Sequence, residues 1–139
     1  MKLMRNKAKV LAFEQERRNL FALVPYEQSC TLVDDDPAVL ELLAEMLQEL
    51  GCEVITQQDA AEALTVLGED QRIEILLTDI NMPGIAGYEL AEQAKRLRPG
   101  VKPILISGRE TDGYGFPLLR KPFMQHDLAC LMKETTGLC

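Results

Sequence analysis

Four short apolar segments of this chain each lead directly into side chains that could hold a phosphoryl group and a metal ion. The segments are 31–33, 75–78, 104–106 and 118–120, and the side chains that follow them are Asp34 with Asp35, Asp79, Ser107 and Lys121. If the segments are parallel strands, their carboxyl ends meet at one edge of a sheet, where open α/β folds place their sites. Three carboxylates gathered there would repel one another unless a cation neutralised them.

This set of groups predicts phosphoryl chemistry at a carboxylate. Oxygen ligands favour a hard ion such as Mg²⁺, and a carboxylate beside that ion can act as a nucleophile and form an acyl phosphate. The Ser107 hydroxyl and the Lys121 ammonium could stabilise charge on the transferring group. The chain contains no glycine-rich phosphate loop, so we expect the phosphoryl group to come from a donor protein rather than from a bound nucleotide.

Alternating strand and helix patterns from Ser29 onward predict an α/β fold with a doubly wound parallel sheet of five strands. The expected strands are 30–33, 53–56, 73–78, 103–106 and 118–120, and the expected helices are 37–50, 60–67, 86–97 and 125–134. The strand at 73–78 is continuously apolar after Glu74, which indicates a central position.

Capping residues support these helix limits. Asp36 is a plausible N-cap before Pro37, and Gly51 suits the position after the last helical residue. Asp59 and Glu62 resemble a capping box for the second helix, which Gly68 is expected to close.

The segment between the fourth and fifth strands breaks the regular pattern. Residues 108–117 contain Gly108, Gly113, Gly115 and Pro117, although parallel strands need a crossover of about a dozen residues. We therefore expect the helix of this crossover to be shortened or missing.

Residues 1–28 are expected to form an N-terminal helical arm ahead of a domain at 29–139. Apolar side chains occupy five of seven a/d heptad positions within residues 1–24: Leu3, Val10, Phe13, Leu20 and Val24. Packing against the domain and helix pairing with a partner, including a homodimer through residues 1–24, both stay open, because three heptads are too few to decide between them.

Composition limits the partners and the compartment. At 139 residues and 47% hydrophobic, the chain can bury one core, and residues 25–139 carry nine Lys/Arg against twenty acids, so nucleic acid is not an expected partner. Cys30, Cys52, Cys130 and Cys139 form no C-x-x-C pair, and with His126 as the single histidine a Cys/His metal site is not expected. We expect reduced thiols, no signal peptide and no membrane span, and these expectations together favour a cytoplasmic protein.

The motifs together resemble the receiver domain of two-component response regulators over about residues 29–136. The matching stretches are Leu32–Pro37, Leu77–Gly84, Ile104–Gly108 and Leu119–Phe123. The resemblance implies a flavodoxin-like fold with strand order 2-1-3-4-5. It also implies a histidine kinase or histidine phosphotransfer protein as the phosphoryl donor.

The resemblance further implies a role for each matched residue. Asp79 would be the phosphoacceptor, with Ser107 and Lys121 contacting the phosphoryl group. Mg²⁺ would be bound by Asp35, Asp79 and the backbone carbonyl of Asn81, with Asp34 assisting through water. A cis peptide between Lys121 and Pro122 is implied as well.

Three departures from the family pattern bear on signalling. Leu118 stands where members usually carry Tyr or Phe, and the interval from Ser107 to Lys121 is short. As the third departure, we expect no output domain after the last helix. Residues 118–123 also resemble receivers attached to hybrid histidine kinases. The expected function is a stand-alone receiver that catalyses only its own phosphorylation and dephosphorylation, and is not otherwise an enzyme.

Two other functions stay open from the residues. A phosphorylation-independent binding module could keep the acids, and Leu118 with the short interval favours it. A phosphatase of the haloacid dehalogenase type would use Asp34 and Asp36 as its Asp-x-Asp pair, but it leaves Asp79 without a role. That fold also needs an acid pair after Lys121, where only Asp127 and Glu134 follow.

Overall fold

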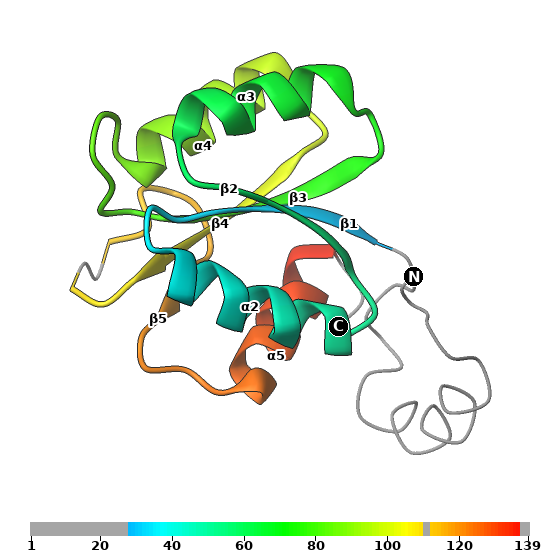
Figure 1. Ribbon diagram of the computed structural model, residues 1–139, viewed down its shortest axis with the longest axis vertical. Helices are drawn as coiled ribbons and strands as arrows, with labels where there is room; N and C mark the ends of the chain where they lie inside the picture. Colours follow the sequence, from blue (N-terminus) through cyan, green and yellow to red (C-terminus); the bar gives the residue numbers. More distant parts are fainter. Residues whose placement is uncertain (1–27, 110–111, 137–139) are drawn as a thin grey trace.

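A single parallel sheet of five strands organises the molecule, of which the computed structural model describes residues 28–109 and 112–136. The strands are β1 (Ser29–Val33), β2 (Glu53–Gln57), β3 (Ile73–Asp79), β4 (Lys102–Ser107) and β5 (Leu118–Arg120). Their order is β2-β1-β3-β4-β5 and every neighbouring pair is parallel, which confirms the predicted topology (Figure 1).

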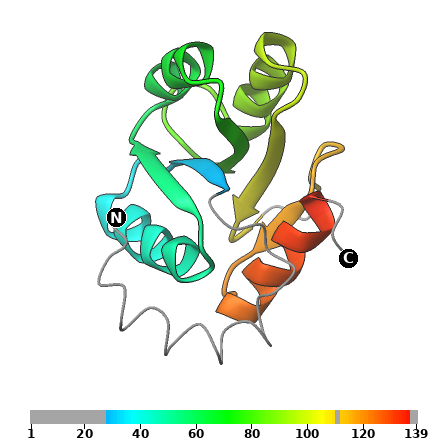
Figure 2. The same ribbon diagram turned by 90° about the vertical axis from the view of Figure 1, so that its right-hand side faces the viewer.

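Two pairs of helices cover the two faces of this sheet (Figure 2). The helices α2 (Pro37–Glu49) and α5 (Gln125–Thr136) lie on one face. The helices α3 (Ala60–Glu69) and α4 (Gly87–Leu97) lie on the other face. The sheet is therefore the middle of three layers, as the doubly wound fold requires.

The central strand β3 contributes to both cores, which explains why its sequence shows no polar alternation. Ile75 and Leu77 belong to the apolar cluster that also contains Leu43 of α2 and Leu128 of α5. Leu76 belongs to the cluster of α3 and α4 on the opposite face. Because β3 has a strand on each side and a helix layer on each face, both of its faces are buried.

Helix α2 begins and ends as its sequence predicts. The Asp36 carboxylate accepts a hydrogen bond from the backbone N–H of Ala38 at 3.0 Å, and Gly51 adopts a positive φ of 95° just beyond the helix. The leucine stripe of this helix is buried against the sheet, from Leu40 to Leu50.

Helix α3 begins as expected but extends further than expected. Asp59 accepts a hydrogen bond from the Glu62 N–H at 2.8 Å, so the predicted cap at its start is present. The prediction that Gly68 closes the helix is wrong, because α3 continues to Glu69. Asp70 ends it instead: its N–H still bonds the Val66 carbonyl, while its side chain accepts hydrogen bonds from Arg72 and directs the chain into β3.

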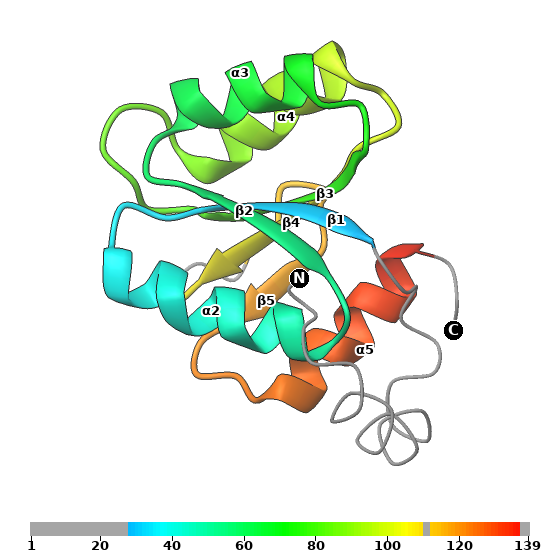
Figure 3. The same cartoon turned by 45° about the vertical axis from the view of Figure 1, so that its right-hand side comes forward.

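The connection between β4 and β5 contains no helix in its described residues, 108–109 and 112–117, which confirms the expected loss of the crossover helix (Figure 3). A tight turn takes its place, with the Phe116 N–H donating to the Gly113 carbonyl at 2.8 Å. A Cβ on Gly113 would lie 2.3 Å from the Phe116 carbonyl oxygen, so only glycine fits there. The turn ends with the Leu105 N–H bonded to the Pro117 carbonyl at 2.9 Å.

Arg98 joins the end of α4 to the chain entering β3. Its two terminal nitrogens donate to four backbone carbonyls at 2.7 to 3.2 Å, those of Leu67, Asp70, Gln71 and Ile73. These bonds hold the amino end of β3, which is the end of the strand opposite Asp79.

Two sequence predictions fall largely outside the described residues. These are the N-terminal arm at 1–28 and the homodimer through residues 1–24, and of these residues the structure describes Gln28 alone.

Among the residues that are described, no helix is both long and apolar enough to cross a membrane. The three described cysteines, Cys30, Cys52 and Cys130, are free thiols in the structure.

Candidate metal centre

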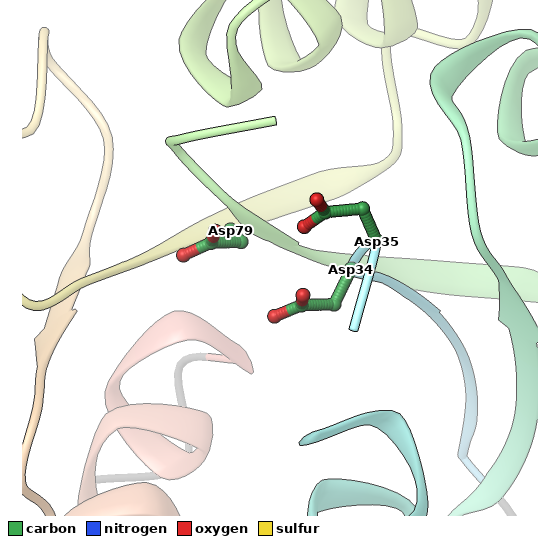
Figure 4. Close-up of side chains that lie close together, drawn as sticks. All are labelled: Asp34, Asp35 and Asp79. Atoms are coloured by element: carbon green, nitrogen blue, oxygen red, sulfur yellow. The ribbon is translucent and has the colours of Figure 1, made fainter. Parts of the chain in front are cut away.

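The three predicted aspartates come together at the carboxyl edge of the sheet. Asp79 is the last residue of β3, and Asp34 and Asp35 directly follow β1, its neighbour. The register pairs Val33 with Thr78, so the residues after them are adjacent. One carboxylate oxygen of each aspartate lies within 4.8 Å of those of the other two (Figure 4).

Burial distinguishes the three carboxylates. Asp34 is 3% exposed and Asp79 is 8% exposed, whereas Asp35 lies at the surface. Burial, with the nearby Asp79 charge adding to it, raises the pKa of Asp34 to about 6, although the Asp36 N–H donates to its Oδ1 at 2.9 Å. Burial also raises the pKa of Asp79, and the Lys121 ammonium opposes that rise. Both side chains would thus be more stable as anions with a cation beside them.

Lys121 supplies one positive charge at this edge. Its Nζ lies 3.6 Å from Oδ1 of Asp79, and its side chain is partly exposed. The lysine follows β5 directly, and its backbone N–H donates to the Ser107 carbonyl at 2.8 Å. The peptide between Lys121 and Pro122 is cis, as the family resemblance implied.

Ser107 and Asn81 flank the aspartates on neighbouring segments. Ser107 is fully buried at the end of β4, one residue beyond Ile106, the register partner of Asp79. Its Oγ accepts a hydrogen bond from the Arg109 N–H at 3.0 Å. Asn81 is exposed in the loop after β3, and the metal-binding role of its carbonyl stays a prediction.

Gly87 is a residue of this site that the sequence analysis missed. A Cβ on this first residue of α4 would lie 2.1 Å from the backbone carbonyl oxygen of Asp79, so no other residue fits without moving one of the two segments. Its N–H donates to the Ile80 carbonyl at 2.9 Å. A signal was available in the sequence, because glycine is a poor choice for the first turn of an amphipathic helix unless close packing requires it.

Leu118 and the altered connection form a small apolar cluster beside the site. Leu118 and Phe116 pack against a buried group that contains Ile80, Ala91 and Leu105. Next to them, the rings of Tyr88 and Tyr114 stack with centroids 4.0 Å apart and planes 16° from parallel. Tyr114 and Phe116 of the loop therefore pack on the side of α4 that carries Tyr88 and Ala91.

The donor set fits a hard divalent ion. Three carboxylates offer oxygen ligands within one ion's reach, and two of them are buried groups whose pKa values burial has raised. Mg²⁺ is held in proteins by one or two carboxylates together with waters and phosphate oxygens. With Lys121 and Ser107 at the same edge, the arrangement can hold a cation and a phosphoryl group side by side.

Comparison with known proteins gives a consistent result. The family model of the response regulator receiver domain matches residues 30–128. An uncharacterised transcriptional regulatory protein, YbdJ of Bacillus subtilis, is 33% identical over 110 residues, which is 74% of this chain and 48% of that protein. The sensor histidine kinase RcsC of Escherichia coli is 41% identical over 66 residues, which is 48% of this chain and 7% of that protein.

A solved structure agrees with these matches in sequence and in fold. The CheY-like receiver domain protein of Methanospirillum hungatei is 31% identical with a TM-score of 0.70, covering 81% of this chain and 94% of that one. The chain thus spans nearly all of an isolated receiver domain, but half or less of the curated relatives named above.

Proposed function

Since this chain belongs to the response regulator receiver family, we propose that Asp79 is its phosphoryl acceptor in a Mg²⁺-dependent reaction. The observation that carries the proposal is the placement of the Asp79 carboxylate. It lies within 4.8 Å of those of Asp34 and Asp35, and 3.6 Å from the Lys121 ammonium. A nucleophile, a cation site and a fixed positive charge therefore share one sheet edge.

Each residue has a defined part in the transfer. Asp35, Asp79 and the Asn81 carbonyl would hold Mg²⁺, with Asp34 acting through water, and the ion would neutralise negative charge on the aspartates and the incoming group. A carboxylate oxygen of Asp79 attacks phosphorus in a phosphohistidine of the donor. The P–N bond breaks, the histidine nitrogen takes the electron pair, and an acyl phosphate remains on Asp79.

Lys121 and Ser107 would stabilise that product. The Lys121 ammonium, already paired with Asp79, can pair with a phosphoryl oxygen. The Ser107 hydroxyl accepts a bond from the Arg109 N–H and can donate its own proton to another phosphoryl oxygen. Hydrolysis of the acyl phosphate by water returns the protein to its starting state, so the only reactions that it catalyses are on itself.

The donor that we propose is a histidine kinase or a histidine phosphotransfer protein. The similarity to RcsC supports this choice, as does that to the receiver domain of the hybrid histidine kinase CckA, which is 33% identical with a TM-score of 0.68. The excess of acids over Lys/Arg in residues 25–139 argues against nucleic acid as a partner of this domain.

A phosphorylation-independent binding module is the second candidate, and two features favour it. Leu118 replaces the usual aromatic residue, and the β4–β5 connection lacks a helix in its described part. The complete set of acids, hydroxyl and lysine favours the phosphoacceptor. The receiver topology and the family match disfavour a haloacid dehalogenase-type phosphatase.

Labelling with acetyl phosphate tests the proposal directly. The protein is incubated with acetyl phosphate, with and without Mg²⁺, and its intact mass is measured. We expect one added phosphoryl group in the wild type with Mg²⁺, none in Asp79→Asn, and an unchanged level in Asp127→Asn, whose carboxylate lies on α5. Lack of Mg²⁺-dependent labelling in the folded wild type would favour the binding module instead. Phosphotransfer from purified histidine kinases, with the same variants, then identifies the donor.

A further inference from the structure

A histidine and a cysteine lie side by side on the surface of α5, outside the aspartate site. His126 and Cys130 are one helical turn apart, and Nε2 of the histidine is 3.5 Å from Sγ of the cysteine. His126 is exposed and Cys130 is half-buried. Side chains four residues apart lie on the same face of a helix, so the helix places an imidazole beside a thiol. A search for pairs of closely spaced cysteines does not find such a pair of metal ligands.

The separation of the two donor atoms matches the requirement of a tetrahedral metal ion. Bond lengths of about 2.0–2.1 Å from zinc to nitrogen and about 2.3 Å from zinc to sulfur, at a tetrahedral angle, place the donors about 3.5–3.6 Å apart. The observed 3.5 Å fits this spacing without a change of backbone or helix register. The same distance also suits a thiol–imidazole hydrogen bond, which is the metal-free form of the pair.

The pair offers two protein ligands and leaves the other positions of an ion open. Within the described residues, the one group of three or more carboxylate, cysteine or histidine ligand atoms is the cluster of Asp34, Asp35 and Asp79. An ion on α5 would therefore complete its coordination with water or with a ligand from another molecule. This open arrangement differs from a closed structural zinc site, which uses four protein ligands.

Ligand chemistry separates this position from the aspartate cluster. Thiolate and imidazole select zinc, cobalt or copper, whereas carboxylates and carbonyls suit Mg²⁺. We propose that His126 and Cys130 form a second metal site, with a preference for Zn²⁺ or a similar borderline divalent ion, on the outer surface of α5. Binding replaces the thiol proton of Cys130, which leaves to solvent, while neutral His126 donates a ring-nitrogen lone pair.

Cobalt titration of the full chain tests the ligands. The reduced protein is titrated with Co²⁺ in excess Mg²⁺, which competes with Co²⁺ for the aspartate cluster, and thiolate-to-cobalt charge transfer is recorded in the near ultraviolet. We expect this band in the wild type and its loss in Cys130→Ser and in His126→Ala. Cys139→Ser is the matched thiol control and should keep the band. A band that survives in Cys130→Ser or His126→Ala, or that is lost in Cys139→Ser, would overturn the two-ligand site.

A variant and a second readout separate ligand loss from unfolding. Cys130→His keeps two nitrogen ligands one turn apart, so it should still bind Co²⁺ but without the thiolate band. Zn²⁺ should slow alkylation of Cys130 by about tenfold or more, measured by peptide mass spectrometry, because the metal-bound thiolate is no longer a free nucleophile. Equal protection in His126→Ala, or none in the wild type, would contradict the proposal, and circular dichroism checks the fold of each variant.

Discussion

At the residue scale, Asp34 is held in an environment that disfavours its charge. It is 3% exposed, its pKa is raised to about 6, and burial is the main cause. The folded state therefore retains a proton between the ordinary value of 3.8 and about 6 that the unfolded chain releases. In this range the free energy of unfolding falls as the pH rises. Above about pH 6 the full cost of burying the charged Asp34 carboxylate is present. A cation bound beside the carboxylate would remove much of that cost.

Replacing Asp34 with asparagine should therefore stabilise the metal-free protein. Asparagine keeps an oxygen that can accept the hydrogen bond from the Asp36 N–H, but it carries no charge. We expect the free energy of unfolding of Asp34→Asn to exceed that of the wild type by about 1–3 kcal/mol at pH 8, and the difference to disappear near pH 4. Urea unfolding with a metal chelator present measures both values.

The matched control for Asp34→Asn is Asp112→Asn. Asp112 is exposed and accepts a local bond from the Tyr114 N–H, which asparagine can also accept. Asp112→Asn should change the free energy of unfolding by no more than about 0.5 kcal/mol, which is usual for surface substitutions. An Asp34→Asn effect that does not change with pH would show that ionisation is not its cause.

At the scale of the elements, the β4–β5 connection packs against α4 although its described residues form no helix. Its Tyr114 ring stacks on Tyr88 of α4, while Phe116 and Leu118 pack toward Ala91 of the same helix. The connection thus has a specific packing arrangement although it is short and rich in glycine. A surface formed in this way differs from the helical surface expected at this position in the family.

The stacked tyrosines should be energetically coupled. Aromatic pairs contribute about 0.5–1.5 kcal/mol beyond the area that they bury. A double-mutant cycle with Tyr88→Leu, Tyr114→Leu and the double variant should give a coupling free energy in that range by urea unfolding. If the two single substitutions lower the free energy of unfolding by amounts whose sum matches the double variant to within about 0.3 kcal/mol, the rings do not stabilise each other.

Sequence patterns were sufficient for features that depend on local signals. The five strands, the caps by Asp36 and Asp59, and the meeting of Asp34, Asp35 and Asp79 follow from periodicity, capping and the geometry of parallel sheets. The register that fixes the spacing of the aspartates is set by neighbouring strands and is only partly visible in the sequence.

Features that depend on contacts between distant segments were not predicted. Gly87 is required because α4 begins against the Asp79 carbonyl. Tyr114 contacts Tyr88 only in the folded structure, because the two residues belong to different segments of the chain. Helix α3 ends later than the sequence predicts because Gly68 is tolerated inside the helix. Asp70 and Arg72 form the turn that follows it. In each case tertiary contacts decided the outcome rather than local propensity.

At the scale of the whole molecule, folding brings together the residues of the candidate cation site. Asp35, Asp79 and Lys121 are far apart in sequence, and they meet because β1, β3 and β5 end at one sheet edge. An unfolded chain keeps these residues but does not bring them together. A cation that binds there must therefore stabilise the folded state.

Magnesium should raise the free energy of unfolding, and the increase should grow with the logarithm of its concentration once that exceeds the dissociation constant. At about ten times the dissociation constant we expect an increase of about 1.4 kcal/mol. Urea unfolding with and without Mg²⁺, at constant ionic strength, measures this increase. Asp35→Asn should abolish most of it, and Asp127→Asn should retain it. Equal stabilisation of the wild type and Asp35→Asn would place the effect elsewhere on the protein.

Arg98 anchors the sheet at the end remote from the aspartates. Its bonds to four backbone carbonyls hold the entry of β3 through contacts that include no residue of the cation site. The carboxyl edge, by contrast, is formed by loops and strand ends. None of the Arg98 contacts involves a residue of the β4–β5 connection, so the sequence of that connection can change while the amino end of β3 stays held in place.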